Sequence, residues 1–346
     1  MREAKWSDDE AEERKAPGPR HRLRQPAAAS ARLLLSARRI RPAAPPPPPL
    51  RCLFRTHPAD QLRSPVLSLD LREGLLACAG HDATLRLLRA SEAETAGYVS
   101  QRAIHLESRP LHLARFLDPA RLLCAFDRGG AGLLDLASER LLPLHKLWPA
   151  SQSLPAGAAP HPRRALALLF AARHTCLVDA RAEGVTLRAD HAHPLRAATF
   201  LNEHVCAAAF TDAQVRLFDL RRGLAQPVST LRGDHAVLAG DESLLVGGGR
   251  GGAVQLYAWR EGGLGRTLRP LRADVTALSV SGQHIAAASA WQAEGVRLLS
   301  SDGVTVPGWP TGRARLGTVT SLCAAEGHLA LGNSLGRVSL YRLHPL

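Results

Sequence analysis

Three groups of residues in this chain could carry chemistry: a glycine run, two neighbouring histidines and six cysteines. Residues 247–252 read Gly-Gly-Gly-Arg-Gly-Gly, and Gly247, Gly249 and Gly252 match the spacing of a dinucleotide-binding loop. That loop requires a helix N-terminus after it, where backbone N–H groups hold the pyrophosphate. Here an apolar strand is expected to follow at residues 254–257, so the run predicts a hairpin turn and no cofactor.

The histidines and cysteines provide no evident ligand set. His191 and His193 form the closest pair among fifteen histidines, in a polar stretch where solvated loop residues are expected. No two cysteines lie closer than 26 residues, so the paired-thiolate spacing of a zinc site is missing. Four cysteines lie in apolar segments and are expected to be buried, in a reducing compartment. We therefore expect no metal site.

The acidic residues are scattered through expected turns, for example at Asp82, Asp212 and Asp241. In a turn, such a carboxylate can accept hydrogen bonds from nearby backbone N–H groups. The sequence offers no nucleophile, base and orienting group at a spacing that indicates a catalytic set. We expect a protein that is not an enzyme, with no catalytic residue and no small-molecule substrate.

The N-terminal cations are the residues with the clearest chemistry. Residues 14–59 hold eleven Arg or Lys and no Asp or Glu, in a chain of formal net charge +13. Because arginine forms bidentate hydrogen bonds with phosphate, such a run favours RNA, DNA or another polyanion. The residues expected to contact RNA phosphates are Arg20, Arg22, Arg24, Arg38, Arg39 and Arg41. A nuclear or nucleolar address, or a simply solvated charge run, is the alternative interpretation.

The elements that position these residues recur seven times: an apolar segment, a small-residue segment, a turn and a second apolar strand. Equivalent positions in the second apolar strands are Leu85, Leu133, Leu177, Val215, Val254, Val296 and Val338. The steps between them are 48, 44, 38, 39, 42 and 42 residues. This period, with four short strands per unit, predicts an all-β, seven-bladed WD40-type β-propeller, a fold that favours a scaffold over an enzyme.

The propeller is expected to span residues 50–346, and its third unit to be the least regular because residues 149–162 are rich in Pro, Ala and Gly. Its seventh unit, residues 319–343, contains only three expected strands. Residues 50–56 alternate like a strand, so we expect them to supply the missing outer strand and close the ring. No apolar run approaches the roughly 18 residues that cross a bilayer, so no membrane partner is expected.

Residues 1–49 are expected to form a disordered tail, acidic up to residue 13 and then rich in Arg, Ala and Pro. A transit peptide is the alternative, because such peptides are also rich in arginine. The acidic cluster at the start argues against it, since transit peptides are poor in acidic residues.

The C-terminal part of the chain resembles a known family. Residues 296–299, 309–311, 319–322 and especially the block Leu-Ala-Leu-Gly-Asn-Ser-Leu-Gly-Arg-Val-Ser-Leu-Tyr-Arg-Leu-His at residues 329–344 are similar to the last blades of the U-three small nucleolar RNA-associated protein eighteen family. Residues 104–110 and 141–145 agree at the equivalent places of an earlier blade. The resemblance covers about residues 62–346 and is weakest over residues 149–192.

This resemblance implies a WD-repeat scaffold subunit of the small-subunit processome, in its UTP-B module, that assists processing of the pre-18S ribosomal RNA. The implied partners are other processome proteins, pre-ribosomal RNA and small nucleolar RNA, and the implied location is the nucleolus within the nucleus. Family members can carry a Leu-Phe motif that ends in an apolar residue and Asp and recruits the exosome helicase. Leu53 and Phe54 begin like that motif, but Thr56 and His57 depart from it.

Two other classes of function remain open. One is a WD-repeat substrate receptor or signalling adaptor with no RNA partner. The other is a propeller enzyme, for which the sequence offers no supporting motif.

Overall fold

Short strands joined by tight turns pair with their neighbours in sequence, because the turn brings their backbone N–H and C=O groups within hydrogen-bonding reach. The computed structural model describes residues 50–56, 62–90, 98–106, 110–127, 129–145, 147–148, 154–307, 309–310 and 315–344. The chain divides into two units, Met1–Pro46 and Pro47–Leu346, and all described residues belong to the second.

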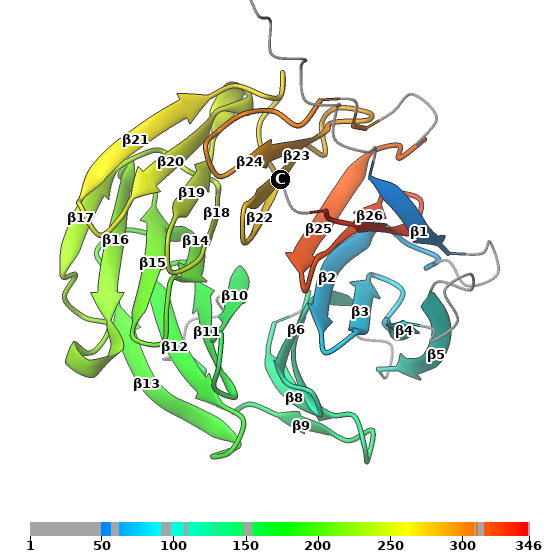
Figure 1. Cartoon of the computed structure of the whole chain (residues 1–346). Coiled ribbons are helices and arrows are strands. Elements are labelled where there is room, and N and C mark those ends of the chain that lie inside the picture. The colour runs from blue at the N-terminus through cyan, green and yellow to red at the C-terminus, as the bar shows by residue number, and fades with distance from the viewer. Residues whose placement is uncertain are drawn as a thin grey trace, which may run out of the picture. The chain divides into compact units, whose positions relative to one another are not determined.

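Seven antiparallel sheets form a seven-bladed β-propeller in this second unit, as the repeat predicts (Figure 1). Blade 1 contains β2 (Val66–Arg72), β3 (Leu75–Gly80), β4 (Thr84–Ala90) and β5 (Tyr98–His105). Blade 2 contains β6 (Leu111–Asp118), β7 (Arg121–Phe126), β8 (Ala131–Asp135) and β9 (Leu141–Pro143). Blade 3 contains β10 (Gly157–Pro160), β11 (Leu166–Ala171), β12 (His174–Asp179) and β13 (Gly184–Asp190). Blade 4 contains β14 (Leu195–Phe200), β15 (Val205–Phe210), β16 (Gln214–Asp219) and β17 (Ser229–Arg232).

The remaining blades are less uniform. Blade 5 contains β18 (Val237–Gly240), β19 (Leu245–Gly248), β20 (Val254–Ala258) and β21 (Gly263–Leu268). Blade 6 contains β22 (Ala277–Ser281), β23 (His284–Ala288) and β24 (Val296–Ser300). Blade 7 contains β25 (Val319–Ala325), β26 (His328–Asn333), β27 (Val338–Arg342) and, from the other end of the unit, β1 (Arg51–Arg55). The first strands β2, β6, β10, β14, β18, β22 and β25 contact one another in that order, and β25 contacts β2 again.

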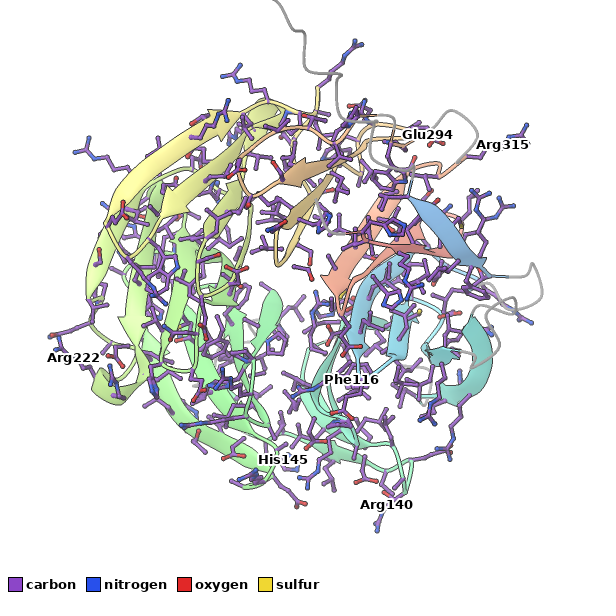
Figure 2. All side chains as sticks on the ribbon, viewed as in Figure 1. Phe116, Arg140, His145, Arg222, Glu294 and Arg315 are labelled. Atoms are coloured by element: carbon purple, nitrogen blue, oxygen red, sulfur yellow. The ribbon has the colours of Figure 1, made fainter. Side chains whose placement is uncertain are left out.

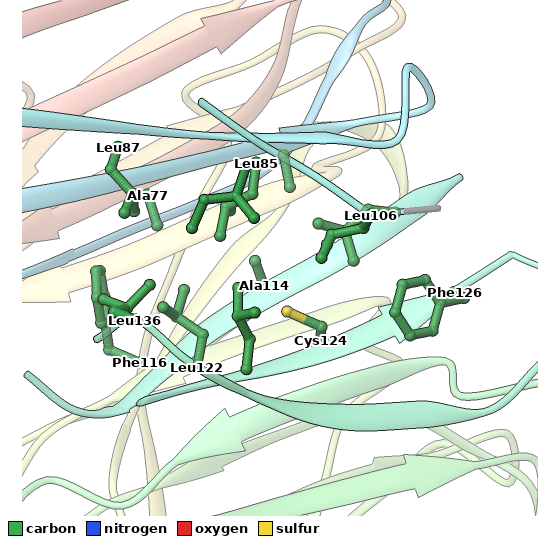
Figure 3. Close-up of a cluster of buried hydrophobic side chains, with 14 residues drawn as sticks. Ala77, Leu85, Leu87, Leu106, Ala114, Phe116, Leu122, Cys124, Phe126 and Leu136 are labelled. Carbon is green, nitrogen blue, oxygen red and sulfur yellow. The ribbon is translucent and has the colours of Figure 1, made fainter. Parts of the chain in front are cut away.

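The hydrophobic core is divided among the seven interfaces between neighbouring blades. Seven clusters of buried side chains occupy these interfaces, and the one between blades 1 and 2 includes Leu85, Phe116 and Cys124 (Figure 3). The second strand of each blade is buried on both faces, as in β23, where every residue is buried. Alanine and cysteine dominate several of these strands, because small side chains let sheets on both sides approach closely.

Serine side chains add hydrogen bonds between innermost strands that belong to different blades. Ser68 Oγ donates to Ala114 O at 3.0 Å and accepts the Ala114 N–H at 3.1 Å. Ser279 Oγ accepts the Ala324 N–H at 2.9 Å in the same way. Buried backbone N–H and C=O groups require a hydrogen-bond partner. The serine hydroxyls supply that partner to backbone groups that have no strand beside them at the blade interface.

The strand expected at residues 50–56 to close the ring is present as β1. It pairs antiparallel with β27, so that Arg51 lies opposite Arg342 and Arg55 opposite Ser339. Beyond the strand, the Thr56 N–H donates to Val338 O at 2.9 Å, and Thr56 Oγ1 accepts the Val338 N–H at 3.1 Å. Pairing of the two chain ends removes a free edge from blade 7.

Blade 6 differs from the expectation of four strands in each unit. Its sheet has three strands, and residues after β24 cover the edge only locally: the Val306 N–H donates to Leu298 O at 2.8 Å, and Leu299 forms an isolated bridge with Thr305. Blade 3 keeps all four strands although β10 lies in the irregular segment that follows blade 2. Among the described residues, no helix is long and apolar enough to cross a bilayer.

Candidate functional site

The glycine run is a turn between β19 and β20, as predicted, with a short 3-10 helix at Arg250–Gly252. Its glycines are required by close packing. A Cβ atom on Gly247 would lie 2.5 Å from the ring of His235, and one on Gly252, which has a φ of +72°, would collide with Leu271 O. Strand β20 follows the turn, so no helix begins after the glycine run, where a pyrophosphate site requires one.

His235 is buried against this turn and serves the fold. Its Nε2 lies 2.7 Å from the Tyr257 hydroxyl, whose oxygen also lies 2.9 Å from Arg232 O. Loss of hydration on burial lowers the pKa of His235 to about 4 and raises the pKa of Tyr257 to about 12. Both groups are therefore neutral at physiological pH and hold blade 5 together.

His161 links blades 3 and 4. Its Nδ1 accepts the N–H groups of Arg163 and Arg164 at 3.1 and 2.9 Å, so the ring proton lies on Nε2, which donates to Glu203 O at 2.9 Å. Burial lowers the pKa of this histidine. With both nitrogens occupied, the ring can neither accept a substrate proton nor ligate a metal.

The pair His191 and His193 was expected to be solvated, and for His191 this is wrong. His191 is half-buried, its Nε2 lies 3.0 Å from Thr175 Oγ1, and its ring packs edge-on against Phe210 and Phe218 at 5.3 and 5.5 Å. The connection into blade 4 packs on these rings, which the local polar sequence does not reveal. His193 is exposed and lies 3.6 Å from the carboxylate of Asp212, so the two histidines have different partners.

Two of the three acidic turn residues behave as predicted. Asp82 accepts the Arg63 N–H at 3.1 Å, and Asp241 accepts the Ser243 N–H at 2.8 Å. Asp212 differs, because its carboxylate accepts the guanidinium of Arg216 four residues later.

Five of the six cysteines are buried packing residues, whereas Cys52 on β1 is exposed. The four expected in buried strands, Cys78, Cys124, Cys176 and Cys206, are buried, as is Cys323. Burial raises the pKa of Cys124, Cys176 and Cys206 to about 12, so they remain thiols. Among the described residues, no three His, Cys, Asp or Glu side chains gather into a group that could hold a metal.

A cavity of about 310 Å³ lies inside the ring of innermost strands and is lined by residues of all seven blades. Its main charged feature is Asp70 on β2 beside Arg115 on β6, with 3.9 Å between carboxylate and guanidinium. Asp70 also accepts the Phe116 N–H at 2.7 Å, and the Arg115 guanidinium donates to Leu69 O. These bonds join blades 1 and 2, so the pair acts in assembly of the ring.

The two faces of the disc differ in charge. We name as face A the face that carries the turns between second and third strands and the connections from one blade to the next. Face B carries the turns between first and second strands and between third and fourth strands. Consecutive antiparallel strands run in opposite directions, so these two sets of connections lie at opposite ends of the blades. The side-chain contacts agree with this division, because His193 lies beside Asp212 on face A and Arg163 forms an ion pair with Glu203 on face B.

The described acidic residues of face A accept hydrogen bonds or ion pairs from groups of the protein itself. Asp127 pairs with His81, Asp234 with the Arg196 guanidinium at 2.5 Å, and Asp274 accepts the Gly251 N–H at 2.7 Å. The described acidic residues of this face that accept such a hydrogen bond or ion pair are Asp82, Asp127, Asp190, Asp212, Asp234, Asp274 and Glu294.

Exposed arginines remain on face A without an acidic partner. Within the described chain, these are Arg63, Arg173, Arg232, Arg250, Arg269, Arg272, Arg315 and Arg337. Figure 2 shows the side chain of Arg315 pointing outward from the disc. Free guanidinium groups of this kind bind phosphate through paired N–H donors.

Face B has a mixed charge. Exposed arginines such as Arg140 and Arg222 alternate there with exposed acids such as Glu183, Glu242 and Glu261. Among the described residues, the excess of free positive charge is therefore larger on face A, which we take as the candidate functional site.

Sequence reasoning did not find face A. The six tail arginines, Arg20, Arg22, Arg24, Arg38, Arg39 and Arg41, lie outside the described residues, and their contact with RNA stays a prediction. In the helicase-like segment, Leu53 and Phe54 lie in β1 and Thr56 bonds with Val338, while His57 is outside the described residues. Counting the expected strands could have assigned the arginines of face A to one face. The turns after the second strands and the connections between blades lie at the same end of the blades.

Comparison with protein-family models gives no match, and comparison with curated proteins gives no relative.

Proposed function

We propose that this chain is a non-catalytic scaffold subunit of the small-subunit processome that assists pre-18S ribosomal RNA processing and assembly of the small ribosomal subunit. The observation that carries the proposal is the set of exposed arginines on face A, beside acids that are already hydrogen-bonded or paired. A rigid disc with one such face suits a protein that holds RNA and other proteins together. It would act in the nucleolus, with pre-ribosomal RNA, small nucleolar RNA and other processome proteins as partners.

The C-terminal block that resembles the family has a structural explanation of its own. A Cβ atom on Gly332 would lie 2.5 Å from Val66, across the junction of blades 7 and 1. The Asn333 side chain donates to Leu316 O at 3.0 Å and accepts the N–H groups of Leu335 and Arg337 at 3.0 and 2.9 Å. These contacts explain why the fold needs Gly332 and Asn333. The choice of family rests on the resemblance of the whole block, and the charge of face A supports the RNA partner.

The proposal of a scaffold without catalysis rests on the roles of the reactive side chains. His161 and His235 have partners within the fold, and burial keeps Cys124, Cys176 and Cys206 protonated. An enzyme needs such groups at a surface or cavity where substrate can reach them. The basic residues 14–59 add a second source of phosphate contacts in this proposal.

The test is ultraviolet crosslinking of the tagged full chain in cells that express it, followed by sequencing of the bound RNA and identification of bound proteins. We expect pre-ribosomal and small nucleolar RNA, with nucleolar proteins. A matched pair of variants assigns the contact: Arg232, Arg250, Arg269 and Arg272 changed to Gln on face A, against Arg140, Arg164, Arg181 and Arg222 changed to Gln on face B. Ubiquitin-ligase or signalling subunits without RNA would overturn the proposal in favour of the receptor or adaptor class.

A further inference from the structure

The connection between β23 and β24 holds a tryptophan whose side chain is exposed to solvent. Trp291 is 77% exposed, whereas Trp259 and Trp309 are buried. An indole left in water contributes little to the stability of the blade, because its burial is what would stabilise it. Its exposure therefore points to a role outside packing.

The loop that carries Trp291 is nevertheless held firmly. The Trp291 N–H donates to Ser289 Oγ at 3.3 Å, and the Ser289 N–H donates to Gly295 O at 2.8 Å. The Ala290 N–H donates to Thr276 Oγ1 at 2.8 Å, which ties the loop to the preceding connection. The fold thus presents an exposed ring on an ordered base, and an ordered base lowers the entropy lost on binding.

On the blade 5 side, free arginines adjoin this loop. The Arg272 N–H donates to Gln292 Oε1 at 3.4 Å, which places Arg272 beside the residue after Trp291. Arg269 lies in the same connection. Arg250 precedes Gly251, whose N–H is bound by Asp274 of that connection.

On the blade 7 side, a second pair of arginines continues the surface. The Glu294 N–H donates to Gly317 O, and the Gly317 N–H donates to Glu294 Oε1, both at 2.9 Å. This exchange brings the segment that holds Arg315 against the tryptophan loop; Figure 2 shows Arg315 and Glu294 in the same region of the disc. The Arg337 N–H binds Asn333, whose side chain also holds Leu316 O.

We propose that Trp291 is a base-stacking site for single-stranded RNA, and that the arginines on both sides of its loop bind the phosphates of the same strand. Each nucleotide has a flat base that can stack on the indole and a phosphate that matches a guanidinium. The inference deepens the proposed function and rests on it for the choice of RNA over other polyanions.

An acidic protein segment is the other partner that such a surface could attract. Trp and Arg also anchor protein contacts, where the side chain enters a packed apolar pocket of the partner. Trp291 stands exposed beside the polar Gln292, with free arginines in the adjoining connections. Nucleic acid fits this combination better, because it supplies an aromatic face without requiring an apolar pocket.

The experiment measures affinity of the full chain for labelled oligouridylate about 12 nucleotides long, within the range of single-strand site sizes, and for an RNA duplex of the same length. The variants are Trp291→Ala, Trp291→Phe and, as control for loss of an exposed apolar side chain elsewhere, Leu264→Ala. We expect Trp291→Ala to weaken single-strand binding about tenfold, the loss of one base stack, and to leave duplex binding unchanged. Trp291→Phe should retain most of the affinity, and Leu264→Ala all of it.

Equal single-strand affinity of the parent and Trp291→Ala would overturn the inference, as would an equal loss for single strand and duplex. If Trp291→Ala instead loses an acidic protein partner and keeps its RNA affinity, the surface binds protein and the inference is overturned as well. If the parent binds ribosomal precursor RNA in cells while Trp291→Ala binds as well as the parent, only this inference fails. If the parent binds no RNA, the proposed function fails with it.

Discussion

Buried histidines are the residues whose behaviour is easiest to test, and His235 is the clearest of them. Its pKa in the folded protein is about 4, below the ordinary 6.5, because burial removes hydration from the charged ring. Between these values the unfolded chain binds a proton that the folded chain does not, so stability is complete above pH 6.5 and falls toward pH 4. At about 1.4 kcal/mol per pH unit, His235 accounts for a loss of up to about 3 kcal/mol.

His235→Gln should therefore flatten the dependence of the melting temperature on pH between 6.5 and 4, because glutamine does not titrate. The measurement is thermal unfolding across that range, with exposed His145→Gln as control. An unchanged pH profile in His235→Gln would show that other groups cause the acid sensitivity.

Gly247→Ala tests the packing of the glycine run. The new Cβ would lie 2.5 Å from the His235 ring, and the surrounding buried turn leaves that ring little room to move. We expect a loss of about 1–3 kcal/mol in the free energy of unfolding, as for other overpacked cores. Gly263→Ala is the control, since its Cβ would meet no atom within 4 Å. Equal stability of the two variants in denaturant unfolding would contradict the packing account.

At the residue scale, the sequence predicted what depends on local chemistry. Asp82 and Asp241 accept backbone N–H groups because a short acidic side chain in a turn lies close to its own backbone. His191 was missed because its partners, Thr175 and two phenylalanines, belong to strands that only the folded chain brings together. Trp291 was missed because aromatic residues beside strands are usually part of the core.

At the scale of elements, β1 has the most direct consequence for stability. It pairs with β27, and its Leu53 and Phe54 pack against the cluster between blades 7 and 1. Deletion of residues 1–56 should expose the edge of β27 and this apolar surface, lower the melting temperature and promote aggregation. Deletion of residues 1–49 keeps the strand and should leave the melting temperature nearly unchanged.

Thermal unfolding and size-exclusion chromatography of the two deletions would separate these outcomes. If both deletions melt and elute alike, β1 does not close the ring. Closure itself was predictable from the sequence, because the strand-like residues 50–56 precede the first unit and the last unit offers only three strands. The three-stranded sheet of blade 6 was not predicted, because the residues after β24 turn back on its edge at only a few positions.

At the scale of the whole molecule, the repeat predicted the number of blades and the order of the sheets. The net charge of +13 predicted a polyanionic partner. A net charge does not show on which face of the protein the unpaired cations lie. Face A became visible only when the structure showed which acids are already bound, such as Asp234 by Arg196, and which arginines are left exposed, such as Arg269.

The central claim is that face A binds RNA. The most direct test is the salt dependence of RNA affinity in the two fourfold Arg→Gln variants described above. These variants remove equal charge from opposite faces. On single-stranded RNA, removal of each arginine that binds a phosphate should reduce the slope of log K against log salt by about 0.7. We predict that the face A variant binds more weakly and that its slope falls by up to about 3, while the face B variant matches the parent. Equal weakening in the two variants, or no weakening in either, would contradict the account.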